Sequence, residues 1–587
     1  SIAAHASKYL LDAIESMGTR TVLEEGETRE RYRFFDDPEN DGEHAVLGNT
    51  EVLNRFVDDL RTIAAERGKS EKILWFDGPT ATGKSELKRC LVNGLRAYSK
   101  TEAGRRYTVE WNVAAANDTR GLSYGGETTG AERDADWYES PVQAHPLSVF
   151  PPAVREDLLA ALNRESADHV PVSVTEDLDP FSREAYDHLE EFYRRNDTRD
   201  LFSAVTDPAH LRVKNYVVDV GRGIGVLHSE DDGTPKERLV GSWMPGMLRE
   251  LDSRGRKNPQ AFSYDGVLSQ GNGLLTVVED AAQHADLLRK LLNVPDEGRV
   301  KLDKAVGMDV DTQLLIISNP DLDAELDQYA DRNGRDPLKA LKRRLDKHEF
   351  RYLTNVSLEA QLIRRELTAE TAVWGLETEE ELSQRVRAPL VVDVRGSHGT
   401  VRTRELAPHT IEAAAIYSVL TRLDGEDVPP GYDLLDKALL FDYGYIQEGD
   451  DRVTVDEIDF EGADEGIHGI PVTYTRDIIA DLLHEETDRW HPDLDVGSVV
   501  LPEDVLDAMV EGLADAPVFS RSERAEYEDR VALAKEHARN RQEADVLAAL
   551  LAERSVERET VAEYVEHVYA WDGDERVETD RGPVDPD

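Results

Sequence analysis

The 587-residue chain has a single cysteine, Cys90, which excludes intrachain disulfides and metal sites built on several thiolates. It also lacks any apolar run near the ~20 residues that a membrane-spanning helix needs. The longest runs, as in KILWF and QLLIIS, are far shorter, and the first residues have neither a basic start nor a cleavage signal for export. These absences predict a cytoplasmic protein that has no membrane partner.

Lysine and arginine are scarce: together they number 69, against 120 aspartate and glutamate residues, for a formal net charge of −51. The acidic excess is spread along the whole chain. In molar salt the Debye length is about 3 Å, so such a surface stays hydrated without strong self-repulsion. We therefore expect a halophilic protein, with an ordinary acidic protein as the alternative. Nucleic acid is not expected as a partner, because its binding requires a basic stripe and the chain has only a short basic cluster at 338–351.

The length and the spacing of apolar residues predict three regions. Residues 1–50 are expected to form an N-terminal helical segment that includes a charged loop. Residues 51–387 are expected to form an α/β domain with a parallel sheet, interrupted at about 115–260 by an insertion with its own small β element. Residues 388–587 are expected to be mainly helical.

Short apolar runs predict three buried strands, at 73–76, 274–278 and 314–317. Because these strands alternate with helical segments, a parallel sheet covered on both faces is favoured. Within the insertion, the alternating segment 211–241 predicts a hairpin.

The stretch GPTATGKS, from Gly78 to Ser85, matches the phosphate-binding pattern G-x-x-x-x-G-K-[ST] at every fixed position. It stands between an expected strand and an expected helix, the context that the pattern requires. Its amides and the helix N-terminus would converge on phosphate, Lys84 would reach the β- and γ-phosphates, and the Ser85 hydroxyl would ligate Mg²⁺. ATP and Mg²⁺ are therefore the expected cofactors. The predicted nucleotide-binding residues are Gly78, Pro79, Thr80, Ala81, Thr82, Gly83, Lys84 and Ser85.

An acidic pair follows the apolar run GLLTVV. Glu279 is predicted to be the base that polarises the attacking water, and Asp280 to be a metal ligand. In AAA-type ATPases, which this arrangement resembles, an aspartate precedes the glutamate, whereas Val278 stands there in this chain. The alternative is that both acids cap the following helix.

Three further residues are candidates for contact with the nucleotide. Asn319, after the run QLLIIS, is predicted to orient the lytic water or contact the γ-phosphate, with a turn residue as the alternative. Arg344 is predicted to be a finger that acts on a neighbouring subunit, which implies a homo-oligomer such as a ring or dimer; a solvated basic face is the alternative. Arg476 is a candidate γ-phosphate sensor in a helical lid, with a plain surface arginine as the alternative. His409 and His468 have no second ligand at metal spacing and are expected to be structural.

Several segments resemble the PrkA serine protein kinases. The matching pieces span nearly the whole chain and include HASKYLLDAIESMGTR, GPTATGKSELKRCL, HPLSVFP, RVKNYVVDVGRGIG, GNGLLTVVE and EGIHGIP. The resemblance accounts for Val278, and it implies an AAA-type P-loop ATPase module, a helical lid and a C-terminal kinase-like region, which the chain includes incompletely. It further implies an enzyme that transfers the ATP γ-phosphate to serine or threonine of protein substrates, in stress or nutrient adaptation.

The residues themselves do not identify the phosphoryl acceptor. The H-R-D and D-F-G motifs of eukaryotic kinases are missing, so the kinase chemistry rests on the resemblance alone. One alternative is an AAA-type ATPase that remodels or helps degrade proteins without kinase activity. Another is a regulatory scaffold that binds nucleotide and turns it over poorly.

Overall fold

The computed structural model divides into two compact units, one of residues Ser1–Ser383 with Ser418–Asp477 and one of Gln384–Tyr417 with Ile478–Asp587. These boundaries differ from the three predicted regions, because residues 418–477 pack with the first unit. None of the helices among the described residues is long and apolar enough to span a bilayer. The structure describes residues 5–65, 72–113, 137–165, 173–174, 176–228, 235–241, 264–291, 294, 298–303, 306–328, 339–368, 379–395, 401–425, 428, 430–448, 451–458, 465–484, 499–553, 577–579 and 582–584.

A six-stranded sheet forms the centre of the first unit. All of its neighbouring named strands pair in parallel, so the predicted parallel sheet is confirmed. The three strands expected from apolar runs are present at the predicted places. In sheet order the strands are β13 (Leu345–Glu349), β3 (Ile73–Asp77), β12 (Gln313–Ile317), β9 (Leu275–Val278), β8 (Gly223–Leu227) and β7 (Asp219–Val220).

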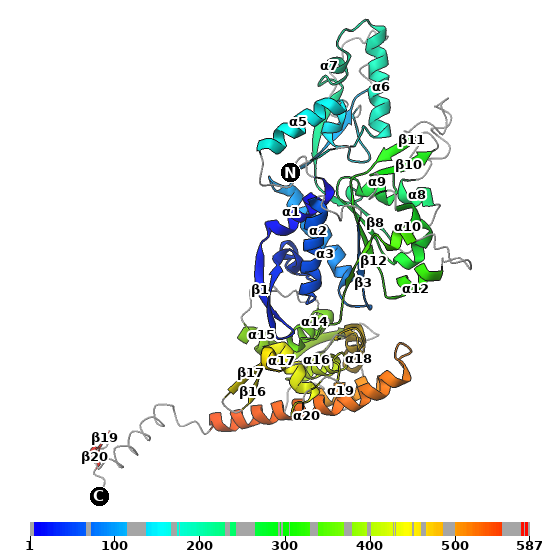
Figure 1. Ribbon diagram of the computed structural model, residues 1–587. Coiled ribbons are helices and arrows are strands. Elements are labelled where there is room, and N and C mark those ends of the chain that lie inside the picture. Colours follow the sequence, from blue (N-terminus) through cyan, green and yellow to red (C-terminus); the bar gives the residue numbers. More distant parts are fainter. Residues whose placement is uncertain are drawn as a thin grey trace. The chain divides into compact units, whose positions relative to one another are not determined.

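Both faces of this sheet are covered, as a continuous apolar strand requires. Leu74 and Phe76 of β3 belong to one hydrophobic core, whereas Ile73 and Trp75 belong to a second core on the other face. Figure 1 shows the two sets of helices on opposite sides of the sheet. Helices α1 (Ala6–Ser16), α2 (Thr50–Ala64) and α3 (Lys84–Lys100) contribute to the first core, and α9 (Val267–Gly271), α10 (Ala285–Leu291) and α12 (Asp321–Gln328) to the second.

The N-terminal segment contains a hairpin that the helical prediction for residues 1–50 missed. Strands β1 (Thr19–Glu24) and β2 (Glu27–Tyr32) pair in antiparallel register. Their sequences, TRTVLE and ETRERY, carry charges on both faces, which hides the alternation typical of strands. The buried Arg31 is held by the Asp36 carboxylate at 3.0 Å and by the Gly48 carbonyl at 3.0 Å. Polar contacts, and not an apolar face, therefore hold this hairpin against the rest of the unit.

Two strands of the predicted insertion join β4 (Arg106–Trp111), which precedes it, in a three-stranded sheet, and the hairpin predicted at 211–241 is wrong. Strand β6 (Leu211–Tyr216) pairs with β4, which also pairs with β5 (Tyr138–Glu139). Strand β8 instead joins the main sheet beside β9. Gly225 lets β8 approach α9 closely, because an added Cβ would overlap the Val267 carbonyl. The helices here are α5 (Pro152–Glu165), α6 (Pro180–Arg195), α7 (Leu201–Val205) and α8 (Pro235–Leu239).

Further elements complete the first unit. The hairpins are β10 (Arg299–Asp303) with β11 (Val306–Asp309), and β16 (Tyr445–Glu448) with β17 (Asp451–Thr454). Its helices include α13 (Lys339–Lys342), α14 (Val356–Thr368) and α17 (Leu434–Tyr443). Asp433 and Asp436 form a capping box that starts α17. Helices α15 (Glu379–Arg387), α16 (Thr410–Leu420) and α18 (Val472–His484) each cross a boundary between the units.

The second unit is largely helical, as predicted, and also contains a small sheet. Buried His409 contacts the carboxylates of Glu412 and Asp545 at 2.7 Å each. These contacts are consistent with the structural role expected for this histidine. The sheet consists of β14 (Leu390–Arg395), β15 (Val401–Leu406) and β18 (Val499–Val500); the remaining elements are α19 (Pro502–Leu513), α20 (Arg521–Glu553), β19 (Val577–Thr579) and β20 (Gly582–Val584).

Candidate functional site

The glycine-rich loop connects the end of β3 to the start of α3, so the predicted strand, loop and helix are confirmed. Gly78 has a φ of 150° and Gly83 a φ of 95°, values that favour glycine. An added Cβ at Gly78 would overlap the carbonyl of Phe350. The loop therefore turns tightly beside the chain that follows β13, and no larger residue fits at its first position.

The Lys84 side chain folds back over the loop. Its ammonium donates hydrogen bonds to the carbonyls of Gly78 and Pro79, at 2.6 Å each, and lies 3.4 Å from the Thr82 hydroxyl. Burial lowers the pKa of Lys84 to about 8, and the nearby Asp77 and Asp280 carboxylates only partly oppose this shift. A phosphate that replaced the two carbonyls would supply the negative charge that this buried cation lacks.

A cavity of about 430 Å³ opens above the loop, within the first unit. This volume is in the range typical of small-molecule sites. The cavity lies where β3, β9 and β12 end, and ligands of open α/β sheets bind at such carboxyl edges. Residues lining it include Thr80, Ala81, Thr82, Gly83, Lys84, Ser85, His228, Glu279, Asp280, Ser318, Asn319, Arg351, Arg365 and Arg422. Gly78 and Pro79 are not among the described lining residues; their carbonyls hold Lys84 instead.

The structure brings the predicted base, Glu279, into this cavity together with Asp280 and Asn319. One Glu279 oxygen lies 2.8 Å from the Lys88 ammonium and the other lies 3.0 Å from Nδ1 of His228. The carboxylate is thus held by two side chains that sequence reasoning missed. His228 follows the buried strand β8, so the shared edge of parallel strands was the signal that could have located it.

A buried network fixes the strand ends below the loop. The Ser318 hydroxyl donates to Asp77 at 3.1 Å and accepts from the Trp75 indole at 2.7 Å. The Lys347 ammonium pairs with the other Asp77 oxygen at 2.7 Å. These residues lie on β3, on β13 and just after β12. The network therefore fixes the ends of these strands beside the loop, and Asn319 follows directly after Ser318.

Arg344 lies at the end of the sheet away from the loop. Its carbonyl accepts from the amide of Ile73, at the start of β3, and it is not among the described residues that line the cavity. Five strand residues at about 3.3 Å each separate the two ends of β13. Arg344 therefore lies away from the cavity, and its predicted role as a finger that acts on a neighbouring subunit stays a prediction. Arg351, from the same basic cluster, does line the cavity because β13 ends beside the loop.

Three further arginines, Arg365, Arg422 and Arg476, differ in the groups that their guanidinium groups contact. Arg422 forms a fully buried, two-point ion pair with Glu359, at 2.7 Å for each contact. Arg365 lines the cavity and donates to the Ala45 carbonyl at 3.1 Å, and burial lowers its pKa. Arg476 is not among the described lining residues; it pairs with Glu366 at 3.1 Å and with its neighbour Asp477. Its assignment as a sensor stays a prediction.

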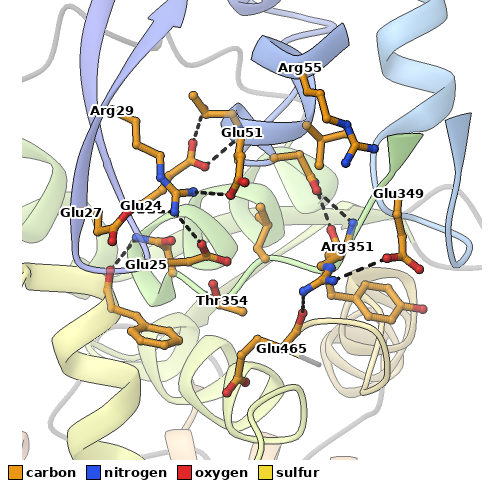
Figure 2. Close-up of a pocket in the computed structure, with 18 of the residues that line it drawn as sticks. Glu24, Glu25, Glu27, Arg29, Glu51, Arg55, Glu349, Arg351, Thr354 and Glu465 are labelled. Atoms are coloured by element: carbon orange, nitrogen blue, oxygen red, sulfur yellow. Dashed lines mark hydrogen bonds and ion pairs between the residues drawn. The ribbon is translucent and has the colours of Figure 1, made fainter. Parts of the chain in front are cut away.

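A second cavity of about 430 Å³ adjoins the first, and Arg351, Tyr352 and Leu353 line both. Figure 2 shows its charged wall. Arg29 lies 3.1 Å from both Glu25 and Glu27, and Arg351 lies 3.5 Å from Glu349. The Arg351 guanidinium also lies 3.4 Å from the Glu465 carbonyl, and its residue lines both cavities.

Comparisons with known proteins agree with the resemblance drawn from the sequence. Residues 435–583 match the family described as the PrkA serine protein kinase C-terminal domain. Over 541 residues, the chain is 24% identical to the ATP-dependent protease PrkA of Bacillus subtilis (strain 168), covering 91% of this chain and 68% of that protein. Among solved structures, NtrX from Brucella abortus matches at 9% identity, covering 82% of this chain and 71% of the NtrX chain. The TM-score of 0.24 is too low to indicate a shared fold. The C-terminal match and the similarity over most of the chain support the resemblance to the PrkA family.

Proposed function

We propose that the chain is an AAA-type P-loop ATPase that binds ATP with Mg²⁺ at residues 78–85 and hydrolyses it to act on proteins. The observation that supports this proposal most strongly is that Lys84, Glu279 and Asn319 line the same cavity, at the carboxyl edge of a parallel sheet. This arrangement combines a buried cation for the phosphates with a carboxylate for the attacking water. The name of the Bacillus subtilis relative, an ATP-dependent protease, supports the use of ATP.

The residues fit the proposed ligands. Lys84 would exchange its two backbone carbonyls for phosphate oxygens, and the loop amides would complete the phosphate site. The Ser85 hydroxyl and the Asp280 carboxylate offer the oxygen donors that Mg²⁺ prefers. When bound, Mg²⁺ would neutralise negative charge on the phosphates. Glu279, oriented by Lys88 and His228, would accept the proton of the attacking water, and Asn319 would position that water.

Serine/threonine kinase activity is the second candidate function. It is favoured by the description of the family that matches residues 435–583. In this candidate the same loop binds ATP, and a protein hydroxyl replaces water as the acceptor of the γ-phosphate. The name of the relative, a protease, favours the alternative in which ATP hydrolysis drives remodelling or degradation of proteins.

Incubation of the whole chain with γ-labelled ATP, Mg²⁺ and an unfolded protein such as casein separates these candidates. Release of labelled free phosphate supports the ATPase, whereas label on serine or threonine of casein or of the chain itself supports the kinase. Lys84→Ala should abolish both activities. Lys100→Ala is the matched control, because Lys100 is an exposed lysine at the far end of the same helix. If the wild-type chain gives neither product, the proposed function is wrong.

A further inference from the structure

The second cavity of the first unit has the volume of a small-molecule site and opens beside the candidate nucleotide cavity. It measures about 430 Å³, and Arg351, Tyr352 and Leu353 line both cavities. The hairpin of β1 and β2 and the start of α2 supply much of the remaining wall. The proposed nucleotide contacts at residues 78–85 are not among its described lining residues. The second cavity is therefore a separate space that adjoins the candidate nucleotide site.

Carboxylates outnumber basic groups in the wall of this cavity. Six glutamates and three arginines line it, and Figure 2 labels all nine. The Lys437 ammonium pairs with one of the glutamates, Glu465, from outside the lining, which leaves a formal excess of two negative charges. Because acidic residues are in excess along the whole chain, the burial and contacts of the individual groups decide what this wall can bind.

Two of the three arginines already have partners in the chain. Arg29 lies 3.1 Å from the carboxylates of both Glu25 and Glu27. The Arg55 guanidinium donates to the backbone carbonyl of Lys347. An anionic ligand would have to displace these contacts and would then meet the remaining carboxylates. The wall therefore favours a cationic ligand.

One carboxylate of the wall is buried without an ion pair. Glu24 is 6% exposed, and its oxygens accept hydrogen bonds from the amide of Thr50, at 3.1 Å, and from the Thr50 hydroxyl. No basic side chain among the described residues forms an ion pair with it. Arg31 donates to the same hydroxyl but has Asp36 as its own ion-pair partner, at 3.0 Å. A buried carboxylate that is held only by neutral donors gains from a cationic partner.

A second buried polar group lines the same cavity. Thr354 is 6% exposed and lies among the lining side chains in Figure 2. Its hydroxyl has no hydrogen-bond partner among the described residues. Because buried polar groups are nearly always hydrogen-bonded, this hydroxyl points to an atom of a ligand. Val52 and Val455 add apolar surface to the wall, so the cavity suits a ligand with a cationic end and an apolar stem.

We propose that this cavity binds a lysine or arginine side chain of a polypeptide, with its cation against Glu24 and Thr354. Both side chains join a cation to a stem of methylene groups that packs on apolar surface, and a threonine hydroxyl can accept a hydrogen bond from the cation. Buried charge pairs are screened much less than exposed ones, so the contact withstands high salt. This inference rests on the proposed function, because it defines the protein substrates as segments that carry a basic residue beside the candidate nucleotide site.

Fluorescence anisotropy with a labelled peptide tests the proposal on the whole chain, without nucleotide. The peptide is short, has blocked ends and is uncharged except for one central lysine; a matched peptide has glutamine in place of the lysine. We expect saturable binding of the lysine peptide only. Glu24→Gln should weaken this binding by about 10- to 100-fold, because a hydrogen bond between charged groups is lost. Glu30→Gln removes the same charge at an exposed position of the same hairpin and should leave the binding unchanged.

Thr354→Val keeps the shape of the side chain, removes its hydroxyl and should weaken binding by about 10-fold. Circular dichroism checks the folding of each variant, and Thr354→Val decides the outcome if Glu24→Gln unfolds. The proposal is overturned if the folded wild-type chain binds neither peptide or both equally, if both variants bind as the wild type does, or if only a free polyamine such as spermidine binds. Because the titration contains no ATP, a chain that binds the lysine peptide without hydrolysing ATP would contradict the proposed ATPase and not this site.

Discussion

The Lys88 ammonium and the Glu279 carboxylate form an ion pair of 2.8 Å across the candidate nucleotide site. Lys88 lies one helical turn after Lys84 on α3, so the helix that carries the proposed phosphate-binding lysine also orients the proposed base. His228 holds the second carboxylate oxygen. The position of Glu279 is therefore set by two separate elements, α3 and the end of β8.

The first prediction concerns this ion pair. Glu279→Gln should bind ATP normally and lose about 10²–10⁴-fold in turnover, because the base is removed. Lys88→Ala should lower turnover by about 10- to 100-fold with little change in KM, because the carboxylate is misplaced. Steady-state phosphate release measures both. Full activity of Glu279→Gln would move the base to another residue, Asp280 being the nearest candidate.

The second prediction is a pH dependence of ATP affinity. Burial lowers the pKa of Lys84 to about 8 in the nucleotide-free chain, whereas phosphates would favour its charged form. Binding then requires protonation above that pH, so affinity should fall as pH rises through about 8. Lys84→Arg should bind without this fall over the same range, because arginine stays charged. An affinity of the wild type that is flat from pH 7 to pH 9 would contradict the proposed contact.

The third prediction assigns a phosphate contact to Arg351, which lines both cavities and follows the end of β13 beside the loop. Arg351→Ala should reduce turnover by about 10²–10³-fold, the usual cost of removing one donor from a transition state. Arg55→Ala is the matched control, because Arg55 lines the second cavity and is not among the described residues that line the first. Equal turnover in the two variants would exclude Arg351 from the reaction.

The fourth prediction compares two glycines of positive φ. Gly78→Ala places a methyl group against the Phe350 carbonyl, whereas Gly221→Ala meets no atom within 4 Å. Both substitutions carry the backbone cost of a positive φ, and only Gly78→Ala adds an overlap that costs about 1–3 kcal/mol. Thermal unfolding should therefore show the larger loss for Gly78→Ala. A loss no greater than that of Gly221→Ala would mean that the loop does not approach Phe350 this closely.

The fifth prediction concerns the His409 cluster of the second unit. Hydrogen bonding to Glu412 raises the pKa of His409, so its stabilising effect is complete below its ordinary range and is lost as pH rises through the raised value. The pKa of Glu412 is lowered: burial opposes the shift, but hydrogen bonds from His409 and His537 and the charges of Arg387 and Arg541 outweigh it. Its contribution is complete above the ordinary range of a glutamate carboxyl and is lost as pH falls below that range. Amide hydrogen exchange in α20 should therefore speed up as pH rises above neutrality, after correction for the intrinsic pH dependence of exchange. His409→Gln should remove this additional pH dependence.

The sequence was sufficient for the sheet strands that are apolar throughout. β3, β9 and β12 are continuous runs of buried residues. The loop after β3 matches the pattern G-x-x-x-x-G-K-[ST], which is specific to one kind of strand–loop–helix turn. Strand β13 was not predicted, because LDKHE is polar and lies at the sheet edge. As a result, the positions of Arg351 and Arg344 relative to the loop depend on the pairing of β13 with β3, which the periodicity of the sequence does not show.

The same limit explains the missed partners of Glu279. Lys88 is an ordinary helix lysine in the sequence, and His228 follows a strand that was assigned to a hairpin of the insertion. Only the parallel pairing of β8 with β9 brings His228 to the carboxyl edge of the sheet. The charged hairpin of β1 and β2 was missed because ion pairs, with no apolar stripe, hold it.

Equilibrium titration of the whole chain with ATP and Mg²⁺ in concentrated KCl tests the central claim most directly. We predict one saturable site that Lys84→Ala removes and Lys100→Ala preserves. Absence of saturable binding by the folded wild-type chain, or binding that survives in Lys84→Ala, would contradict the assignment of residues 78–85 as the nucleotide site.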